Sequence, residues 1–184
     1  MKSLPRSALW HSFCYNTRSE FICPGKGFMP KIKNHIKELL DRREFVSIAT
    51  VDKNGRPNSV PKFIFRAKAN HCYLIDYVMG KTVSNLRENP YVSVSFMDLE
   101  ALEAYRLNGT ATLIEKGPVF DEIFRQWDKK LVQLSTDRVI QAVRTGKKNK
   151  AFELAINEKF VVIKIRVESA VKIGRRGEIW QESD

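Results

Sequence analysis

The chain has 184 residues, of which 43% are hydrophobic and 29% charged, and its formal net charge is +11. This composition is typical of one soluble globular domain, and no apolar run approaches the ~20 residues that a membrane helix needs. The three cysteines are too few for a disulfide framework, which favours a reducing compartment. We therefore expect a cytoplasmic protein without a membrane segment.

The first 28 residues lack helical or strand periodicity. They predict an N-terminal extension, followed by a single domain at 29–184, with Met29 as an alternative functional start. The extension holds His11, Cys14 and Cys23, whose spacing fits no standard zinc pattern. No metal site is expected there.

Periodic segments begin at Pro30. Apolar residues at helical spacing predict an amphipathic helix over 30–42. Two strand-like runs then flank Asn54-Gly55, a dipeptide typical of a hairpin turn. The elements predicted from here on are strands 45–51, 57–66 and 71–77, a short helix 82–88, strands 91–97 and 104–115, and helices 117–134 and 136–145. The last is a long strand, "KFVVIKIRVESAVKIG" (159–174), which alternates well over 161–167.

An apolar stripe runs along the predicted helix 117–134 and consists of Phe120, Ile123, Phe124, Trp127, Leu131 and Leu134. At this spacing a stripe indicates a core or dimer face rather than a cofactor-binding motif. About six antiparallel strands interrupted by short helices predict a mainly β domain with α: a small barrel with helices packed outside.

The tripeptide Gly80-Lys81-Thr82 stands between a predicted strand and a predicted helix. A Walker A loop needs a glycine five residues before Gly80, where this chain has Ile75, so an ATP or GTP site is not expected. With Thr82 at the N-cap, the exposed helix start still offers N–H groups, a positive dipole end and the Lys81 charge to an anion. The alternative is that Thr82 only caps the helix and Lys81 only faces solvent.

The positive net charge raises nucleic acid as a partner. Basic residues are spread along the chain, with one cluster at 144–150 that has the character of an exposed loop. No zinc-finger, RNP-like or K-homology motif accompanies this cluster. We expect a solvated basic surface and no nucleic-acid partner.

Three segments taken together resemble a known family: "FVSIATVDKNGRPNSVPKFIF", "HCYLIDYVMGKTVSNLRENPYVSVSF" and "YRLNGTATLIEKG". Their order and spacing are similar to the FMN-binding split-barrel family related to pyridoxamine 5′-phosphate oxidase, over residues 32–118 and more weakly the final strand. The resemblance implies a six-stranded antiparallel split β-barrel that binds FMN. It also implies a homodimer with flavin sites at the subunit interface, and flavin-dependent oxidoreductase activity on an unidentified small molecule.

The resemblance also assigns roles to individual residues. Lys81 and Thr82 match the family positions that bind the FMN phosphate. Ile75 and Asp76 match a pair that lies beside the flavin through main-chain contacts.

The segment "RPNSVPKF", which contains Asn58, matches the strand that runs along the flavin ring and ends at the basic Lys62. A cation there would favour the anionic reduced ring. The alternative for Lys62 is a lysine that snorkels at a sheet edge. Ser59 offers a hydroxyl to the ring or faces solvent, because strand alternation allows both.

The C-terminal tail "VKIGRRGEIWQESD" departs from the true oxidase, because it lacks the Arg-x-His substrate motif, and Ala104 stands near the place of a family glutamine. Vitamin B6 oxidation is therefore not expected. Trp180 either covers a flavin of the partner subunit or anchors the tail against the barrel. No catalytic residue can be assigned, and a non-enzymatic flavin- or haem-binding or stress-related protein on the same fold is the alternative function.

Overall fold

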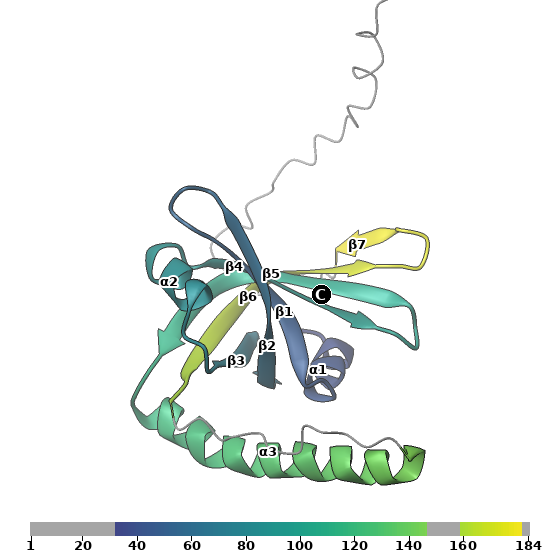
Figure 1. The fold of residues 1–184 in the computed structure, drawn as a ribbon. Helices are drawn as coiled ribbons and strands as arrows, with labels where there is room; N and C mark the ends of the chain where they lie inside the picture. The colour runs from purple at the N-terminus through teal and green to yellow at the C-terminus, as the bar shows by residue number, and fades with distance from the viewer. Residues whose placement is uncertain (1–31, 147–158, 182–184) are drawn as a thin grey trace, which may run out of the picture.

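A computed structural model describes residues 32–146 and 159–181 of the chain. Its strands form one antiparallel sheet in the order β3-β2-β1-β4-β5-β6-β7, and a further pairing of β3 with β6 closes the first six into a barrel (Figure 1). The predicted six-stranded antiparallel split barrel is thus confirmed. The strands are β1 (Phe45–Val51), β2 (Pro57–Lys68), β3 (His71–Asp76), β4 (Tyr91–Asp98), β5 (Glu103–Ile114), β6 (Val161–Ile173) and β7 (Ile179–Gln181).

Three helices accompany the barrel in the described residues: α1 (Asn34–Asp41), α2 (Lys81–Glu88) and α3 (Pro118–Thr145). Helix α1 places Ile36 and Leu40 in the barrel core at the end where β1 begins. Helix α2 places Leu86 in the same core at the opposite end, and its Asn85 donates a hydrogen bond to Thr50 near the end of β1. The two short helices therefore close the two ends of the barrel.

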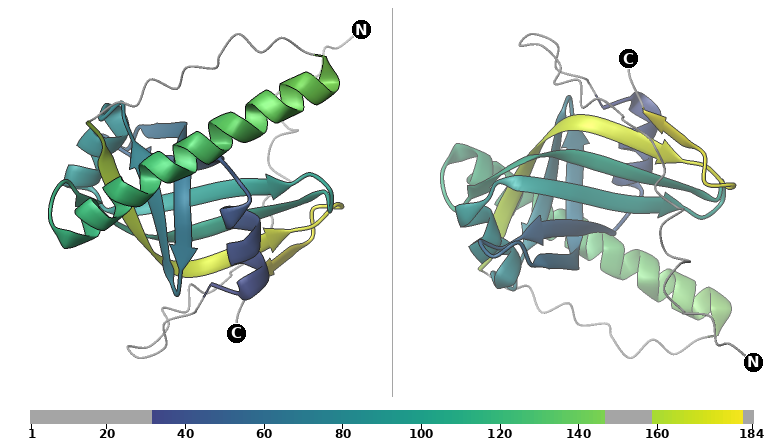
Figure 2. Two further views of the ribbon diagram at one scale, coloured as in Figure 1. Left: turned by 90° about the horizontal axis from the view of Figure 1, so that it is seen from below. Right: turned by 90° about the horizontal axis from the view of Figure 1, so that it is seen from above.

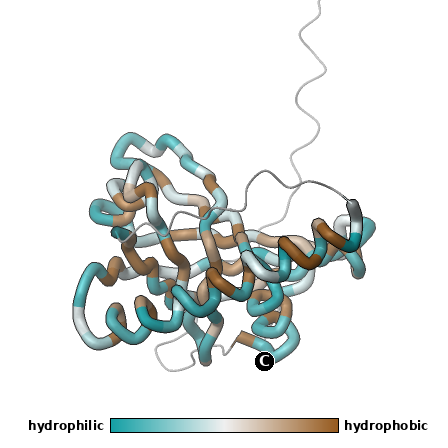
Figure 3. Tube along the Cα trace, turned by 60° about the horizontal axis from the view of Figure 1, so that its bottom comes forward, coloured by the Kyte–Doolittle hydropathy of each residue, from teal (hydrophilic) through white to brown (hydrophobic). Residues whose placement is uncertain are grey.

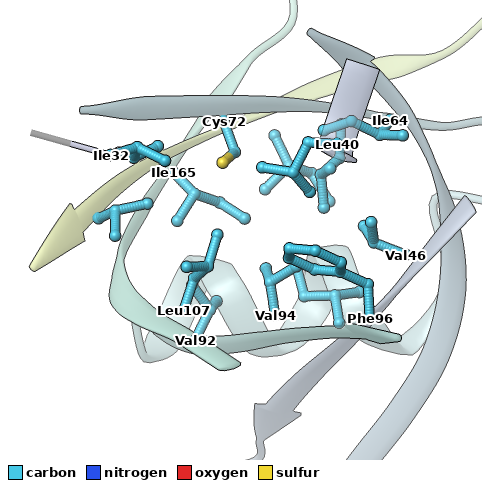
Figure 4. Packing of buried hydrophobic residues seen from close by; sticks show 14 of the residues in the cluster. Ile32, Leu40, Val46, Ile64, Cys72, Val92, Val94, Phe96, Leu107 and Ile165 are labelled. Carbon is cyan, nitrogen blue, oxygen red and sulfur yellow. The ribbon is translucent and has the colours of Figure 1, made fainter. Parts of the chain in front are cut away.

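The barrel core follows from strand alternation, because inward side chains recur every second residue. In β1 the buried positions are Val46, Ile48 and Thr50. Figure 4 shows Val46, Ile64 and Leu107 among the apolar side chains that point into the barrel. The one polar inward position of β1, Thr50, lies at the α2 end.

Helix α3 lies outside the barrel and crosses its strands (Figure 2). It buries Ile123, Trp127 and Leu131 against a second apolar cluster that includes Phe65 and Val162 of the sheet. The apolar stripe predicted from the sequence is therefore a core face. Figure 3 shows hydrophobic and hydrophilic positions alternating along α3, as expected of a helix with one buried face.

The prediction of two helices in this region is wrong, because α3 is continuous through 135–136. The hydroxyl of Thr136 donates to the carbonyl of Val132 (2.9 Å), so this polar side chain is satisfied within the helix and does not end it. The helix ends where Gly146 adopts a left-handed conformation with φ 65°.

Strand β6 (Val161–Ile173) lies within the long strand predicted at 159–174, and the clear alternation ends near Val167 as predicted. Its pairing with β5 shifts register after Asn108, which leaves Glu168 as an extra residue, and the alternation then resumes. At this bulge Gly109 of β5 lies so close to β6 that an added Cβ would stand 2.0 Å from the carbonyl oxygen of Arg166. The bulge interrupts the period-two pattern that sequence reading depends on, and the short β7 beyond it was not predicted.

None of the helices in the described residues is long and apolar enough to span a membrane. His11, Cys14, Cys23 and the lysines of the basic cluster lie outside the described residues, as does the proposed domain boundary at 28/29.

Candidate functional site

The β1–β2 hairpin turns at Asn54-Gly55, as predicted, with Gly55 at φ 77°. Asp52 organises the turn: its Oδ1 accepts the backbone N–H groups of Asn54 and Arg56, each at 2.9 Å. These bonds, the one from Arg56 foremost, lower the pKa of Asp52 against the opposing effect of burial. Asp52 is therefore an anion held in a fixed place.

The second oxygen of this carboxylate faces the start of α2. Lys81 Nζ donates to Asp52 Oδ2 at 3.1 Å, and the Lys81 side chain is 57% exposed while that of Asp52 is 8% exposed. The first helical hydrogen bond of α2 runs from Ser84 N–H to the Gly80 carbonyl (3.1 Å). The N–H groups of the preceding helical residues, 81–83, thus form the positive end of α2 beside an exposed ammonium.

The structure corrects the predicted role of Thr82. The N-cap of α2 is Gly80, and Thr82 is the second helical residue, 3% exposed. It does not lie at an exposed turn, because its Oγ1 accepts a hydrogen bond from Asn58 Nδ2 (3.3 Å). Asn58 Nδ2 also lies 3.4 Å from Thr50 Oγ1, which accepts a bond from Asn85 (3.0 Å). This polar network joins α2 to β1 and β2.

Lys62 and Asp76 form a second ion pair, inside the barrel. Lys62 Nζ lies 2.6 Å from Asp76 Oδ1, and the two side chains are 9% and 0% exposed. Since β2 lies between β3 and β1, the alternative of a lysine that snorkels at a sheet edge is wrong. Among the described residues, Asp76 Oδ2 is buried without a hydrogen-bond partner.

Asp76 also shapes the turn that leads into α2. Its Oδ1 accepts the backbone N–H groups of Val78 (3.0 Å) and Met79 (3.2 Å). Met79 has a left-handed conformation with φ 48°, which costs a non-glycine residue some free energy. The buried carboxylate thereby sets the path of the chain just before Lys81.

The other predicted residues lie elsewhere. Ser59 is on the outer face of β2, exposed, with its Oγ 3.0 Å from that of Ser47. The side chain of Ile75 is buried in the cluster under α3. Trp180 lies on β7, about half exposed, with Lys172 Nζ 5.6 Å from its ring centroid. Of the sequence-predicted set, the structure brings together Lys81, Thr82 and Asn58, and separately Lys62 and Asp76.

Sequence reading missed three polar members of this site: Thr50, Asp52 and Asn85. The signal for Asp52 was present, because an aspartate two residues before Asn-Gly is typical of a turn whose N–H groups it accepts. Thr50 in β1 and Asn85 in α2 lie at positions that the hydrophobic pattern of these elements assigns to the core.

A groove of about 530 Å³ lies along the other side of α2, next to this site rather than at it. Val83 and the ring of Phe160 belong to its apolar part, and Arg87 forms an ion pair with Glu115 at its rim (2.8 Å). Its lining residues are Met79, Val83, Ser84, Arg87, Glu88, Glu115, Phe120, Lys159, Phe160 and Val161.

Within the described part of the chain, the one cysteine is not a candidate nucleophile. Burial raises the pKa of the Cys72 thiol to about 12, so it remains protonated and unreactive. The His71 pKa is lowered, first by burial and then by Lys164 and Arg166. No group of three or more His, Cys, Asp or Glu side chains among these residues could hold a metal ion.

A closed antiparallel barrel with a cationic helix start at one end defines a split-barrel protein with a site suited to an anion. The sequence pattern of the pyridoxamine 5′-phosphate oxidase family matches residues 32–171. The chain therefore belongs to that family. No curated protein matches the sequence.

Solved structures with the same fold share little sequence with this chain. HupZ of Group A Streptococcus is 21% identical with a TM-score of 0.57, over 78% of this chain and 95% of that chain. A Clostridium acetobutylicum protein related to general stress protein 26 of B. subtilis, of the pyridoxinephosphate oxidase family, is 15% identical with a TM-score of 0.53, over 81% and 92%. The haem storage protein HutZ of Vibrio cholerae is 18% identical with a TM-score of 0.51, over 75% and 91%. At these identities the similarity concerns the fold alone.

Proposed function

We propose that this protein binds FMN, with the phosphate at the start of α2, and acts as a flavin-dependent oxidoreductase on a small molecule. The observation that carries the proposal is the exposed ammonium of Lys81 at the N-terminal end of a helix, in a chain of the pyridoxamine 5′-phosphate oxidase family. A phosphate dianion gains charge-assisted hydrogen bonds from such a combination.

The polar residues at the α2 end of the barrel fit a phosphate-bearing cofactor. Asn58 and Lys62 lie on the same face of β2, four residues and therefore about 13 Å apart. Asn58 belongs to the network at the phosphate end, and Lys62 belongs to the ion pair farther along the strand. In this proposal Lys81 binds the phosphate, Asn58 and Thr82 fix the helix start, and Lys62 with Asp76 presents a paired charge to the ring region.

Bound FMN would supply the redox chemistry, while the chain supplies position and electrostatics. Ile75 contributes through its backbone, because its side chain is buried under α3. Trp180 remains proposed as a cover for a flavin in the partner subunit. The substrate is a small molecule other than a B6 vitamer, as the missing tail motif suggests.

A homodimer with the flavin at its interface is part of the same proposal. The outer face of β1, β2 and β4 carries short side chains, Ser47, Ala49, Ser59, Ser93 and Ser95, so a second copy could approach this surface closely. A cytoplasmic location, supported by the low cysteine content, also belongs to the proposal.

An absorption spectrum of the purified protein, followed by titration with FMN, tests the proposed function. We expect flavin bands, and a loss of FMN affinity of about tenfold for Lys81→Gln, because one charge-assisted hydrogen bond to phosphate is lost. Lys129→Gln is the matched control, since Lys129 is an exposed lysine on α3. Equal FMN affinity of the Lys81→Gln and Lys129→Gln variants would refute the phosphate site.

The same spectrum tests the haem alternative, for which a Soret band is expected. HutZ of Vibrio cholerae has this fold, but neither described histidine of this chain, His35 or His71, lines the groove beside α2. A Soret band without flavin bands would replace the flavoprotein proposal by a haem-binding one.

A further inference from the structure

We propose that Asp52 is a built-in counter-ion of Lys81 that weakens the binding of any phosphate group at the start of α2, so that tight binding depends on the organic part of the ligand. This inference rests on the proposed function, because it concerns the same site. It assigns a role to a residue that belongs to none of the cofactor contacts predicted from the sequence.

The two oxygens of Asp52 have different partners. Oδ1 is held by the N–H groups of Asn54 and Arg56, and only Oδ2 meets Lys81. Because Asp52 is 8% exposed and Lys81 57% exposed, the carboxylate is the fixed member of the pair and the ammonium is the member that can turn towards a ligand. A phosphate that arrives at the start of α2 therefore meets a cation already neutralised by a neighbouring anion.

In this proposal Asp52 stays in place when a ligand binds, because its Oδ1 is held by the N–H groups of Asn54 and Arg56. The ammonium has three N–H donors and can bind carboxylate and phosphate at once, but the two anions then repel each other. The second aspartate of the region, Asp76, does not take this role, because Lys62 is its partner inside the barrel. The repulsion weakens the binding of every phosphate-bearing ligand, so only a phosphate monoester whose organic part makes further contacts binds tightly.

Asp52→Asn tests this inference, because an asparagine oxygen can still accept the two turn N–H groups while the charge is lost. Without the Asp52 charge, the partly exposed Lys81 no longer has a competing anion beside it. We expect the dissociation constant for FMN to fall about two- to fivefold. The dissociation constant of inorganic phosphate, obtained from competition with FMN, should fall by the same factor. The affinity for riboflavin, which has no phosphate, should not change.

The chain offers a matched control in Asp98, whose Oδ1 accepts the N–H groups of Glu100 (3.1 Å) and Ala101 (3.3 Å) in the β4–β5 turn. That turn lies at the opposite end of the strands, since β4 runs antiparallel to β1. Asp98→Asn removes the same charge and should leave the FMN affinity as in the wild type. Asp52→Ser, which also offers an oxygen to the turn, serves if Asp52→Asn does not fold.

Failure of the inference and failure of the proposed function give different results. Unchanged or weaker FMN binding in Asp52→Asn, with Lys81→Gln still impaired, would overturn the role of Asp52 alone. An equal gain for riboflavin and FMN would also overturn it, because the effect would then not act on the phosphate. If Lys81→Gln binds FMN like the wild type, the proposed site fails and the inference fails with it.

Discussion

Two lysine–aspartate pairs lie near the same end of the barrel, and they differ in exposure. The Lys62–Asp76 pair is almost fully buried, with 2.6 Å between Nζ and Oδ1. In the Lys81–Asp52 pair only the carboxylate is buried, and the distance is 3.1 Å. We call Lys62–Asp76 the sealed pair and Lys81–Asp52 the open pair.

This difference in exposure determines which pair can exchange its partner for a ligand. A buried ammonium cannot turn to water or to a ligand without leaving an uncompensated charge, so the sealed pair holds β2, β3 and the turn before α2 together. An exposed ammonium loses little when it changes partner. The sealed pair therefore keeps its partners, and only the open pair can bind a ligand by exchanging one.

Breaking the sealed pair should have the largest effect. Asp76→Asn retains an oxygen for the N–H groups of Val78 and Met79 but leaves the Lys62 ammonium without a counter-ion. We expect the free energy of unfolding to fall by roughly 3–5 kcal/mol, measured by urea denaturation. Asp98→Asn is the control for loss of a turn aspartate outside an ion pair, and a similar loss there would contradict the role of the sealed pair.

Removing both charges of the sealed pair should cost less than removing one. In the double variant Lys62→Met, Asp76→Asn no uncompensated charge is buried, and a methionine fills much of the volume of the lysine chain. We expect it to recover at least about 2 kcal/mol of the stability lost in Asp76→Asn. A double variant no more stable than Asp76→Asn would mean that the hydrogen-bonding shape of the pair, rather than its charge balance, holds this end of the barrel.

Much of the fold could be predicted because its signals are local. Strand-like runs predicted β1 and most of β2, and Asn54-Gly55 marked the hairpin whose Gly55 has a positive φ. The pattern failed where a tertiary or side-chain contact changed the local rule. Thr136 is satisfied within α3 by the Val132 carbonyl, and the bulge in β6 is fixed by its approach to β5.

The candidate site could be predicted only in part. Lys81 and Thr82 stood out because Gly80-Lys81-Thr82 lies between a predicted strand and a predicted helix. The hydrogen-bond partner of the buried Thr82 is Asn58, 24 residues away in sequence. The partner of Lys81 is 29 residues away and has an obvious local role in its own turn. A pattern that explains a residue locally gives no reason to search for its long-range partner.

The smallest expected effect is the pH dependence of stability that Asp52 contributes. Its pKa is lowered from 3.8 in the folded chain, first by the Arg56 N–H and less by Lys81. A lowered folded pKa contributes stability that is present above pH 3.8 and is lost as the pH falls through the folded value.

Other carboxylates, such as Glu103 and Glu122, also have a lowered pKa, so the quantity to measure is the difference in unfolding free energy between wild type and Asp52→Asn. This difference should be constant near neutral pH and shrink below pH 3.8, and in the Lys81→Gln background it should shrink less, because the Arg56 bond remains while the Lys81 contribution is gone. A difference that grows on acidification would show that Asp52 is not held as an anion, and the open pair would then be no counter-ion for Lys81.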